Sequence, residues 1–217
     1  DTVTRVVITS SVAAIYGDAI DSLNVPSRTL DETIWNTSSS LTNSEYSYSK
    51  TLAEKKAWEM CKEQDRWNLI TINPSFVLGP ALNPHSNFQS KKVMLQMGDG
   101  DLKYGAPDIT LGMVDVRDVA DLHVLAMTSD KAPGNRFIAS ANTLSMPEWT
   151  RILREAIPEY KKRLPKRTAP DLLIKFLGIF SKTAGFIAEQ LGRTKQLDNS
   201  KAKNLLGWEP RSGEEAL

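Results

Sequence analysis

The sequence predicts an α/β fold built on a parallel β-sheet. Short apolar runs at residues 6–9, 69–74 and 136–139 have the length and composition of buried parallel strands. Segments with helical character lie between these runs, and strands that alternate with helices form parallel sheets. Turn signals such as Gly79-Pro80 separate the elements.

The first part of the chain contains a strand, a loop and a helix. The run over residues 6–9 is β-branched and is followed by small polar residues, as is common for buried strands. Residues 17–44 are rich in Ser, Thr, Asn, Asp and Pro, which predicts a long surface loop. Thr42 and Glu45 have the spacing of a capping box, so we expect a helix over residues 45–64.

The rest of the chain adds further strands and helices. Pro74 closes the strand that begins at Leu69. We then expect, in chain order, a helix over residues 87–97, an extended piece over 110–114, a helix from Asp115 or Asp118 to about Met127, a strand over 136–139 and a helix over 147–157. Residues 158–217 are mainly helical. Apolar residues there share one helical face, which predicts packing against the body of the protein: Leu172, Leu173, Phe176, Leu177 and Phe180.

Length and charge limit the function classes. The chain has 217 residues, with 27 Lys+Arg against 26 Asp+Glu, so it lacks the basic excess typical of nucleic-acid binders. No apolar run reaches the ~18 residues that a membrane span needs. A single cysteine, Cys61, excludes an internal disulfide framework and fits a reducing compartment. Since the start shows no signal-peptide pattern, we expect a soluble, cytoplasmic protein.

Tyr46 and Lys50 form the local pattern that most clearly indicates a chemical function. They are four residues apart on the predicted helix, so their side chains lie one above the other on the same face. Ala53 and Ala57 continue this face and would let the helix approach a sheet or a ligand closely. A free tyrosine has a pKa near 10, and a nearby ammonium stabilises the phenolate, which favours acid–base chemistry. Taken alone, the pattern is also common on exposed helix faces.

Ser10 and Ser11 follow the first strand directly. Open α/β sheets bind ligands beyond the carboxyl ends of their strands. A serine hydroxyl there can donate a hydrogen bond to a carbonyl oxygen that gains negative charge, although a Ser-Ser pair at a strand end is otherwise simple turn chemistry. The order Ser, Tyr, Lys within one β–loop–α–β unit favours an active site.

These residues together resemble the extended short-chain dehydrogenase/reductases, which belong to the NAD-dependent epimerase/dehydratase superfamily. Within it, the sequence is similar to the branch of dihydroflavonol reductases, cinnamoyl-CoA reductases and methylglyoxal reductases. The resemblance covers nearly the whole chain. The matching segments are Arg5-Val-Val-Ile-Thr-Ser-Ser11, Asp31-Glu-Thr-Ile-Trp35, Tyr46-Ser-Tyr-Ser-Lys-Thr-Leu-Ala-Glu-Lys-Lys-Ala-Trp58, Ile72-Asn-Pro-Ser-Phe-Val-Leu-Gly-Pro80, Val114-Asp-Val-Arg-Asp-Val-Ala120 and Asn199-Ser-Lys-Ala-Lys-Asn-Leu-Leu-Gly-Trp208.

The resemblance implies a role for each matching residue. Tyr46 would exchange a proton with the substrate oxygen, Lys50 would hold the nicotinamide ribose, and Ser11 would donate a hydrogen bond to the reacting oxygen. Further cofactor contacts are expected from Thr9, Ser10, Pro74, Ser75, Phe76 and Val77. In the loop after the Gly79-Pro80 turn, the candidate substrate contacts are His85, Asn87 and Phe88.

The fold implied is the C-terminal part of a Rossmann-like, doubly wound parallel sheet with a small, mostly helical substrate-binding lid. Residues 1–80 would form the catalytic part of an incomplete Rossmann domain. Residues 81–217 would form the lid, interleaved with the last Rossmann strand and helix at about 110–140. The family's glycine fingerprint, which binds the cofactor pyrophosphate, does not occur in the sequence, and Gly98-Asp99-Gly100 is interpreted as a turn.

The chain begins with Asp1 and enters a buried-strand pattern almost at once. We therefore expect that an upstream part with four strands and the pyrophosphate site is missing. We expect NADP or NAD as the cofactor, with no residue in this chain that chooses between them.

The activity implied is NAD(P)H-dependent reduction of an aldehyde or ketone to an alcohol. Nucleotide-sugar epimerases and dehydratases use the same Ser/Tyr/Lys chemistry and stay an alternative, since Tyr16-Gly17 resembles them, whereas Trp58 and the segment after Asn73 favour a reductase. A non-catalytic, dinucleotide-binding regulatory protein would be expected to lack the Tyr/Lys pair. Expected partners are a small carbonyl substrate and a second copy docked through the Tyr/Lys helix. We expect no metal, no nucleic acid and no membrane.

Overall fold

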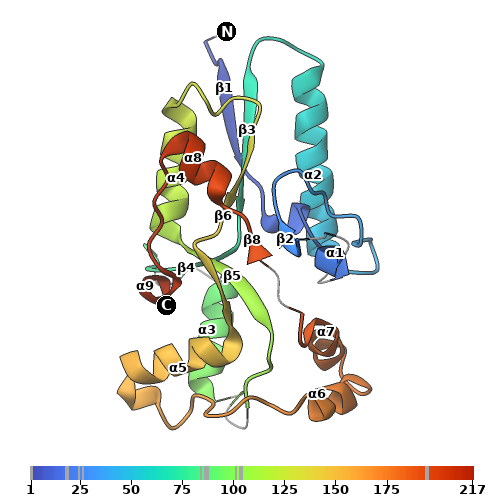
Figure 1. Cartoon of the computed structure of the whole chain (residues 1–217), viewed down its shortest axis with the longest axis vertical. Helices are drawn as coiled ribbons and strands as arrows, with labels where there is room; N and C mark the ends of the chain where they lie inside the picture. Colours follow the sequence, from blue (N-terminus) through green and yellow to red (C-terminus); the bar gives the residue numbers. More distant parts are fainter. Residues whose placement is uncertain are drawn as a thin grey trace.

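The computed structural model (Figure 1) describes residues 2–17, 20–23, 25, 27–83, 85, 88–100, 102, 105–193 and 196–217. Its strands are β1 (Arg5–Thr9), β2 (Thr29–Leu30), β3 (Asn68–Pro74), β4 (Phe76–Leu78), β5 (Thr110–Asp115), β6 (Arg136–Ala139), β7 (Asn142–Ser145) and β8 (Gln196–Leu197). Its helices are α1 (Ile20–Leu23), α2 (Glu45–Lys62), α3 (Gln89–Asp99), α4 (Val116–Thr128), α5 (Met146–Ala156), α6 (Asp171–Gly178), α7 (Lys182–Gln190), α8 (Ser200–Leu206) and α9 (Gly213–Ala216), with short 3₁₀ helices η1 (Val12–Ala14) and η2 (Pro158–Tyr160).

A parallel sheet with helices on both faces forms the upper half of Figure 1. Its strand order is β1-β3-β6, and both pairs are parallel. Helix α2 covers one face, while α4 and α8 cover the other. In the described part of the chain, β1 pairs only with β3. This arrangement confirms the predicted α/β fold of Rossmann type.

A second, smaller sheet lies beyond the carboxyl ends of these strands. Strand β5 pairs with β4 in parallel and with β7 in antiparallel fashion. Helices α3 and α5 pack against it in the lower half of Figure 1. The sequence analysis predicted β5 as an extended piece but missed β4 and β7. Two short strands, β2 and β8, form a separate parallel pair.

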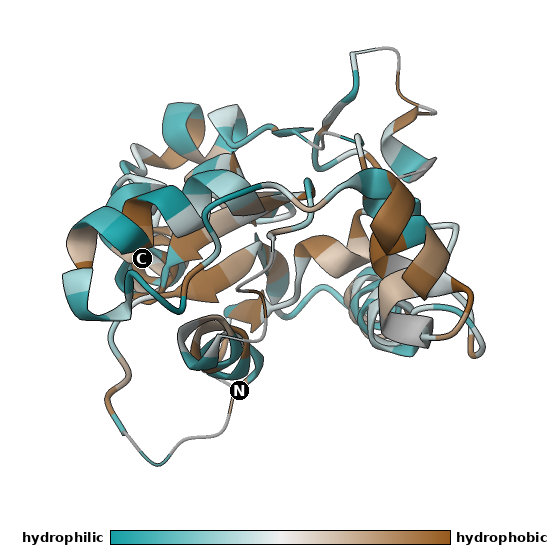
Figure 2. Ribbon diagram, turned by 90° about the horizontal axis from the view of Figure 1, so that it is seen from below, coloured by the Kyte–Doolittle hydropathy of each residue, from teal (hydrophilic) through white to brown (hydrophobic). Residues whose placement is uncertain are grey.

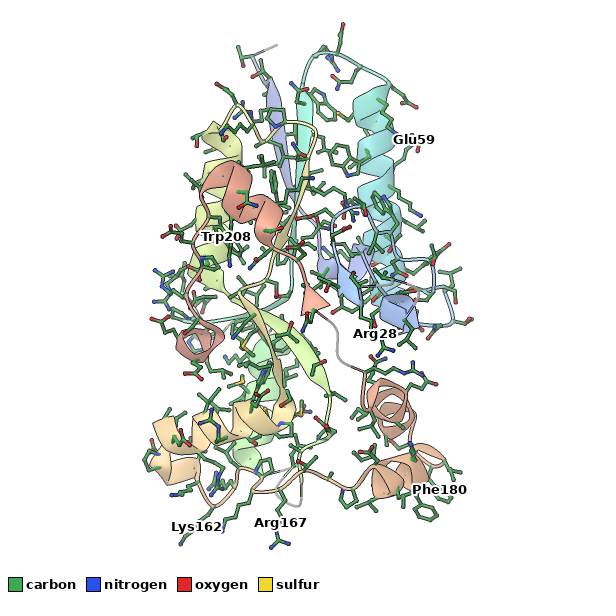
Figure 3. All side chains as sticks on the ribbon, viewed as in Figure 1. Arg28, Glu59, Lys162, Arg167, Phe180 and Trp208 are labelled. Atoms are coloured by element: carbon green, nitrogen blue, oxygen red, sulfur yellow. The ribbon has the colours of Figure 1, made fainter. Side chains whose placement is uncertain are left out.

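The main core lies between the parallel sheet and helices α4 and α8. Ile70, Ile72 and Phe137 from the strands meet Leu122 of α4 and Trp208 after α8, all fully buried or nearly so. The label in Figure 3 marks Trp208 on this side of the sheet. At ~25 cal/mol per Å² of apolar surface removed from water, such packing is the dominant stabilising contribution.

Two predictions about helix starts had different outcomes. Asp115 caps α4, because its carboxylate accepts a hydrogen bond from the backbone N–H of Arg117 at 2.8 Å, as expected. The prediction that Thr42 and Glu45 form a capping box is wrong. The residue before α2 is Ser44, which has a positive φ of 56° and makes no side-chain cap. The predicted loop over residues 17–44 also contains α1 and β2.

The apolar face of residues 172–180 does not pack on the body, which corrects the prediction. Phe180 is 76% exposed and points outward in Figure 3, and Ile174 is the buried residue of α6. The apolar ribbon of α6 lies at the edge of the molecule in Figure 2. Helix α6 instead packs on α7, where Gly178 allows close approach because a Cβ there would lie 3.0 Å from the Gly185 Cα.

A buried ion pair joins α2 to the sheet. Glu54 of α2 is 2% exposed, and its Oε1 accepts a hydrogen bond from Arg136 Nε of β6 at 2.6 Å. Burial alone would raise the pKa of Glu54, but the hydrogen bond and charge of Arg136, together with hydrogen bonds from Ser10 and Asn73, hold it below its ordinary value of 4.5. The carboxylate is therefore ionised in the folded protein at neutral pH.

We predict that the stabilisation from Glu54 depends on pH in the acid range. Because the folded-state pKa lies below the unfolded value, the stabilisation is fully present above about pH 4.5 and is lost as the pH falls through the folded-state pKa. In the full-length protein, Glu54→Gln should lower the free energy of unfolding by about 3–5 kcal/mol at pH 7, since it leaves the Arg136 charge buried and unpaired. Urea unfolding at pH 7 and pH 4 should show that difference shrinking at pH 4.

The matched control is Glu59→Gln on the outer side of the same helix, labelled in Figure 3. Glu59 pairs with Lys56 at 3.0 Å in an exposed position, so its loss should change the free energy of unfolding by less than about 0.5 kcal/mol at both pH values. A Glu54→Gln deficit of equal size at pH 7 and pH 4 would contradict the assignment of the ionised pair.

Candidate active site

A cavity of about 750 Å³ opens where the carboxyl ends of β1 and β3 meet the first turn of α2. This volume lies in the range of small-molecule sites. The described lining consists of hydroxyl, amide and apolar groups: Ser11, Val12, Ala13, Tyr16, Gly17, Tyr46, Ser47, Ser75, Phe76, Val77, Gln89, Ser90, Leu111 and Gly112. Two of the predicted catalytic residues, Ser11 and Tyr46, therefore share one cavity.

Ser11 stands in extended conformation at the start of η1. Its Oγ accepts a hydrogen bond from the backbone N–H of Ala13 at 3.1 Å and so caps this short helix. That bond uses a lone pair of the oxygen and leaves the O–H available to donate to a group in the cavity. The cap also limits the rotation of the side chain.

Tyr46 and Lys50 lie on one face of α2, as their spacing predicted. The Lys50 Nζ is 6.0 Å from the centroid of the Tyr46 ring. Tyr46 is 63% exposed, and it lines the cavity from the first turn of the helix. Ala53 on this face is exposed and Ala57 is half-buried, while the buried residues of α2 are Thr51 and Glu54. Close approach of the alanine face to a ligand stays a prediction.

A second phenol, that of Tyr16, also lines the cavity. Burial raises the pKa of Tyr16 to about 12, so this phenol stays protonated far above neutral pH and resists giving up its proton. Tyr46 has an ammonium beside its ring instead, and a positive charge favours a developing phenolate. The surroundings of the two tyrosines thus differ: the Tyr16 phenol is desolvated, whereas the Tyr46 ring has the Lys50 ammonium near it.

The segment after β3 forms a wall of the cavity. Ser75, Phe76 and Val77 all line it, while Pro74 is buried behind them at the end of the strand. The Ser75 hydroxyl donates to the carbonyl oxygen of Ala139 at 3.3 Å, and the Phe76 ring lies 5.6 Å from the Trp149 ring. These contacts hold the wall rigidly. The apolar side chains of Phe76 and Val77 suit the nicotinamide ring that the family resemblance implies here, and that contact stays a prediction.

The side chains of Thr9 and Ser10 contact other protein groups. Thr9 Oγ1 lies 2.7 Å from His123 Nε2 on α4. Ser10 is buried, and its hydroxyl donates to Glu54 Oε2 at 2.5 Å. Neither residue is among the described lining of the cavity, so contact between their side chains and a cofactor stays a prediction.

The three candidate substrate residues have different positions. Asn87 lies outside the described residues. His85 is exposed, and its backbone N–H donates to Asn83 Oδ1 at 2.9 Å. Phe88, just before α3, lines a neighbouring cavity of about 400 Å³, and Ser90 lines both cavities. Their contact with substrate stays a prediction.

Several lining residues were missed in the sequence. Gly112 is the one with a usable signal, because a glycine inside a strand often marks a close approach of another group. A Cβ on Gly112 would lie 2.6 Å from Leu197 Cδ1 and 2.9 Å from Ser140 Oγ. Ser47, Ser90 and Leu111 carry no such signal, because the cavity they line is assembled from segments distant in the sequence.

The described residues contain neither a cluster of metal-ligating side chains nor a membrane-spanning helix. No group of three or more His, Cys, Asp or Glu side chains gathers there. Asp115 instead forms a two-point contact with Arg117, at 2.8 and 2.6 Å. No helix in this part of the chain is both long and apolar enough to cross a membrane.

Comparison with known proteins gives close agreement in sequence and fold. The NADPH-dependent methylglyoxal reductase GRE2 of Saccharomyces cerevisiae is 32% identical over 232 residues, which cover 100% of this chain and 62% of that protein. Cinnamoyl-CoA reductase 1 of Arabidopsis thaliana is 36% identical over 160 residues, 73% of this chain and 44% of that protein. The crystal structure of the yeast methylglyoxal/isovaleraldehyde reductase Gre2 with NADPH superposes with a TM-score of 0.78 at 30% identity, again over 100% and 62% of the two chains.

The chain thus spans about three fifths of the length of the yeast relative it matches. A family model described as "NAD dependent epimerase/dehydratase family" matches residues 1–139, which include β1, α2, β3 and the cavity residues that they carry. The predicted resemblance is confirmed: the chain belongs to the NAD dependent epimerase/dehydratase family and is similar to its reductases.

Proposed function

We propose that the full-length protein reduces an aldehyde or ketone to an alcohol with NAD(P)H. The observation that carries this proposal is the placement of Ser11 and Tyr46 on one cavity, with the Lys50 ammonium beside the Tyr46 ring. Support comes from two relatives whose names describe an NADPH-dependent methylglyoxal reductase and a cinnamoyl-CoA reductase.

The residues of the chain would bind and polarise the carbonyl group and protonate its oxygen. The Ser11 O–H donates a hydrogen bond to the carbonyl oxygen as negative charge develops there. The Tyr46 O–H donates to the same oxygen and transfers its proton as the alcohol forms. The ammonium of Lys50 stabilises the phenolate that is left on Tyr46. Bound NAD(P)H supplies the hydride. Lys50 would hold the cofactor ribose, and Ser75, Phe76 and Val77 would line its nicotinamide ring.

The cavity lining favours a neutral, small carbonyl substrate. Hydroxyl groups of Ser11, Ser47 and Ser90 combine with apolar groups of Phe76 and Leu111, a surface suited to an aldehyde or ketone with a short apolar tail. NADPH is the proposed cofactor, since the name of the yeast relative specifies it and its solved structure contains it.

One observation favours the alternative of a nucleotide-sugar epimerase or dehydratase. Tyr16 and Gly17, which resemble the epimerase pattern, both line the cavity. Gly17 packs tightly there, because a Cβ would lie 1.9 Å from Ser39 Oγ and 2.7 Å from Asn36 Oδ1. This packing gives Gly17 a local structural role as well, and the reductase proposal stays the better supported one.

We further propose the following organisation. Residues 1–80 form the catalytic part, and residues 81–217 form a lid around the β5 sheet, interleaved with α4 and β6 of the main sheet. Helix α2, which carries Tyr46 and Lys50, is also proposed to take part in a homodimer contact. A cytoplasmic location is supported by the single cysteine, Cys61, which is a free thiol.

Removing the proposed proton donor should abolish most turnover. In the full-length protein, Tyr46→Phe should lower kcat for aldehyde reduction by about 10²–10⁴-fold, the usual contribution of general acid catalysis. Tyr48→Phe, two residues along the same helix, is the matched control and should keep kcat within about threefold. Steady-state NADPH oxidation at 340 nm measures both. Equal activities of the two variants would overturn the role of Tyr46.

The substrate class is tested by activity assays with the full-length protein. Methylglyoxal, isovaleraldehyde and a cinnamoyl-CoA thioester should each be assayed with NADPH and NADH, and UDP-glucose with NAD. We expect NADPH oxidation with at least one of the small aldehydes and a kcat/KM at least tenfold higher with NADPH than with NADH, since tenfold corresponds to about 1.4 kcal/mol of differential transition-state binding. Conversion of UDP-glucose without aldehyde reduction would instead support the epimerase alternative.

A further inference from the structure

Glu54 is a buried acid that the proposed reaction does not use directly. It lies on α2, four residues after Lys50 and eight after Tyr46, and is not part of the described cavity lining. Eight residues along an α-helix correspond to about 12 Å. Glu54 is buried at its position on the helix, whereas Tyr46 lines the cavity. The two side chains belong to one rigid element.

The two oxygens of Glu54 have different partners. Oε1 faces the sheet and accepts hydrogen bonds from Arg136 Nε at 2.6 Å and from Thr71 Oγ1 at 3.0 Å. Oε2 accepts hydrogen bonds from Ser10 Oγ at 2.5 Å and from Asn73 Nδ2 at 2.7 Å. The first set joins α2 to β3 and β6, whereas the second set joins it to Ser10 at the end of β1 and to Asn73 near the end of β3.

Both partners of Oε2 are also connected to Ser11. Ser10 precedes it in the chain, and Asn73 Nδ2 donates a second hydrogen bond, to the main-chain carbonyl oxygen of Ser11, at 3.0 Å. Glu54 Oε2 therefore holds the Ser10 side chain directly and the Ser11 carbonyl group through Asn73. The Thr51 hydroxyl, also on α2, donates to the Ser47 carbonyl oxygen at 2.8 Å and lies 3.4 Å from the Ala13 carbonyl oxygen.

These contacts determine the position of Ser11 relative to Tyr46. The proposed reaction needs both hydroxyls on one carbonyl oxygen, and a misplacement of about 1 Å can cost about 10²-fold in rate. Tyr46 moves with α2, and Ser11 moves with the end of β1. The Oε2 contacts are a direct polar connection between these two elements beside the cavity.

We infer that Glu54 is a positioning residue, which acts through Ser10 and Asn73 to hold the Ser11 hydroxyl within reach of the atom that Tyr46 protonates. This inference rests on the proposed function. It also assigns Ser10 a supporting role beside Ser11, in place of the cofactor contact that the sequence resemblance implies. The ion pair with Arg136 keeps the carboxylate ionised, so that Oε2 is a strong hydrogen-bond acceptor.

The test compares two hydroxyl deletions around the same carboxylate in the full-length protein. Ser10→Ala removes a donor to Oε2, and Thr71→Val removes a donor to Oε1. Both side chains are buried, at 8% and 0% exposure, so each deletion leaves one carboxylate oxygen with a donor fewer. Thr71→Val keeps the shape of the side chain and leaves both donors to Oε2 in place; besides its bond to Oε1 it removes the weaker 3.3 Å contact of Thr71 Oγ1 with Asn73 Oδ1.

We expect Ser10→Ala to lower kcat for aldehyde reduction by about tenfold or more, with the NADPH Kd unchanged within about twofold, because positioning affects the reaction and not cofactor affinity. Thr71→Val should keep kcat within about threefold. The thermal midpoints of the two variants should be similar. Equal kcat values for the two variants would overturn the inference.

A double-mutant cycle separates the inference from the proposed function. If Ser10 acts through Ser11, the kcat loss from Ser10→Ala should vanish in a Ser11→Ala background, because residues that act as one unit are not additive. Multiplicative losses, or a raised NADPH Kd for Ser10→Ala, would show that Ser10 acts independently and would overturn the inference while leaving the reductase intact. Full activity of Ser11→Ala itself would contradict the proposed function first, and the inference with it.

Discussion

The carboxylate of Glu54 lies where α2 meets all three strands of the parallel sheet. It accepts hydrogen bonds from Ser10 after β1, from Thr71 and Asn73 of β3, and from Arg136 of β6. Burying a charge costs several kcal/mol unless it is paired and its remaining lone pairs are satisfied. Here each oxygen has at least two donors, so the position of α2 on the sheet is set by where these donors converge.

The geometry of the candidate active site follows from the position of α2 on the sheet. Because parallel strands end at a common edge, β1 delivers Ser11 and β3 delivers residues 75–77 to the same cavity. Helix α2 is fixed at Glu54, so its first turn brings Tyr46 to that edge. Lys50 lies one turn from Tyr46 and half-way to the buried anchor. The first turn of α2 therefore reaches the cavity, while the middle of the same helix carries the buried ion pair.

The sequence predicted what local patterns encode. Apolar runs and their spacing predicted the parallel strands and the main helices, and the Ser, Tyr and Lys motifs singled out two residues, Ser11 and Tyr46, that line one cavity. The β4-β5-β7 sheet was missed because its strands are three to six residues long and come from distant segments. The exposed face of α6 was predicted wrongly because amphipathic spacing shows that a face is apolar and not what it contacts. Glu54 was missed because a helical glutamate is usually solvated.

The buried side of α2 explains why a polar anchor suits this helix. Its buried residues are Thr51 and Glu54, and the larger apolar residues Leu52 and Met60 are exposed. Apolar packing is non-directional, so it tolerates small shifts of a helix along a sheet. Hydrogen bonds weaken steeply when distance and angle change, and they strengthen where the local dielectric is low. In the proposed reaction, α2 would have to hold Tyr46 within hydrogen-bond reach of a substrate oxygen. That role calls for a directional contact, and the Ser10–Glu54–Asn73 cluster supplies one directly beside Ser11.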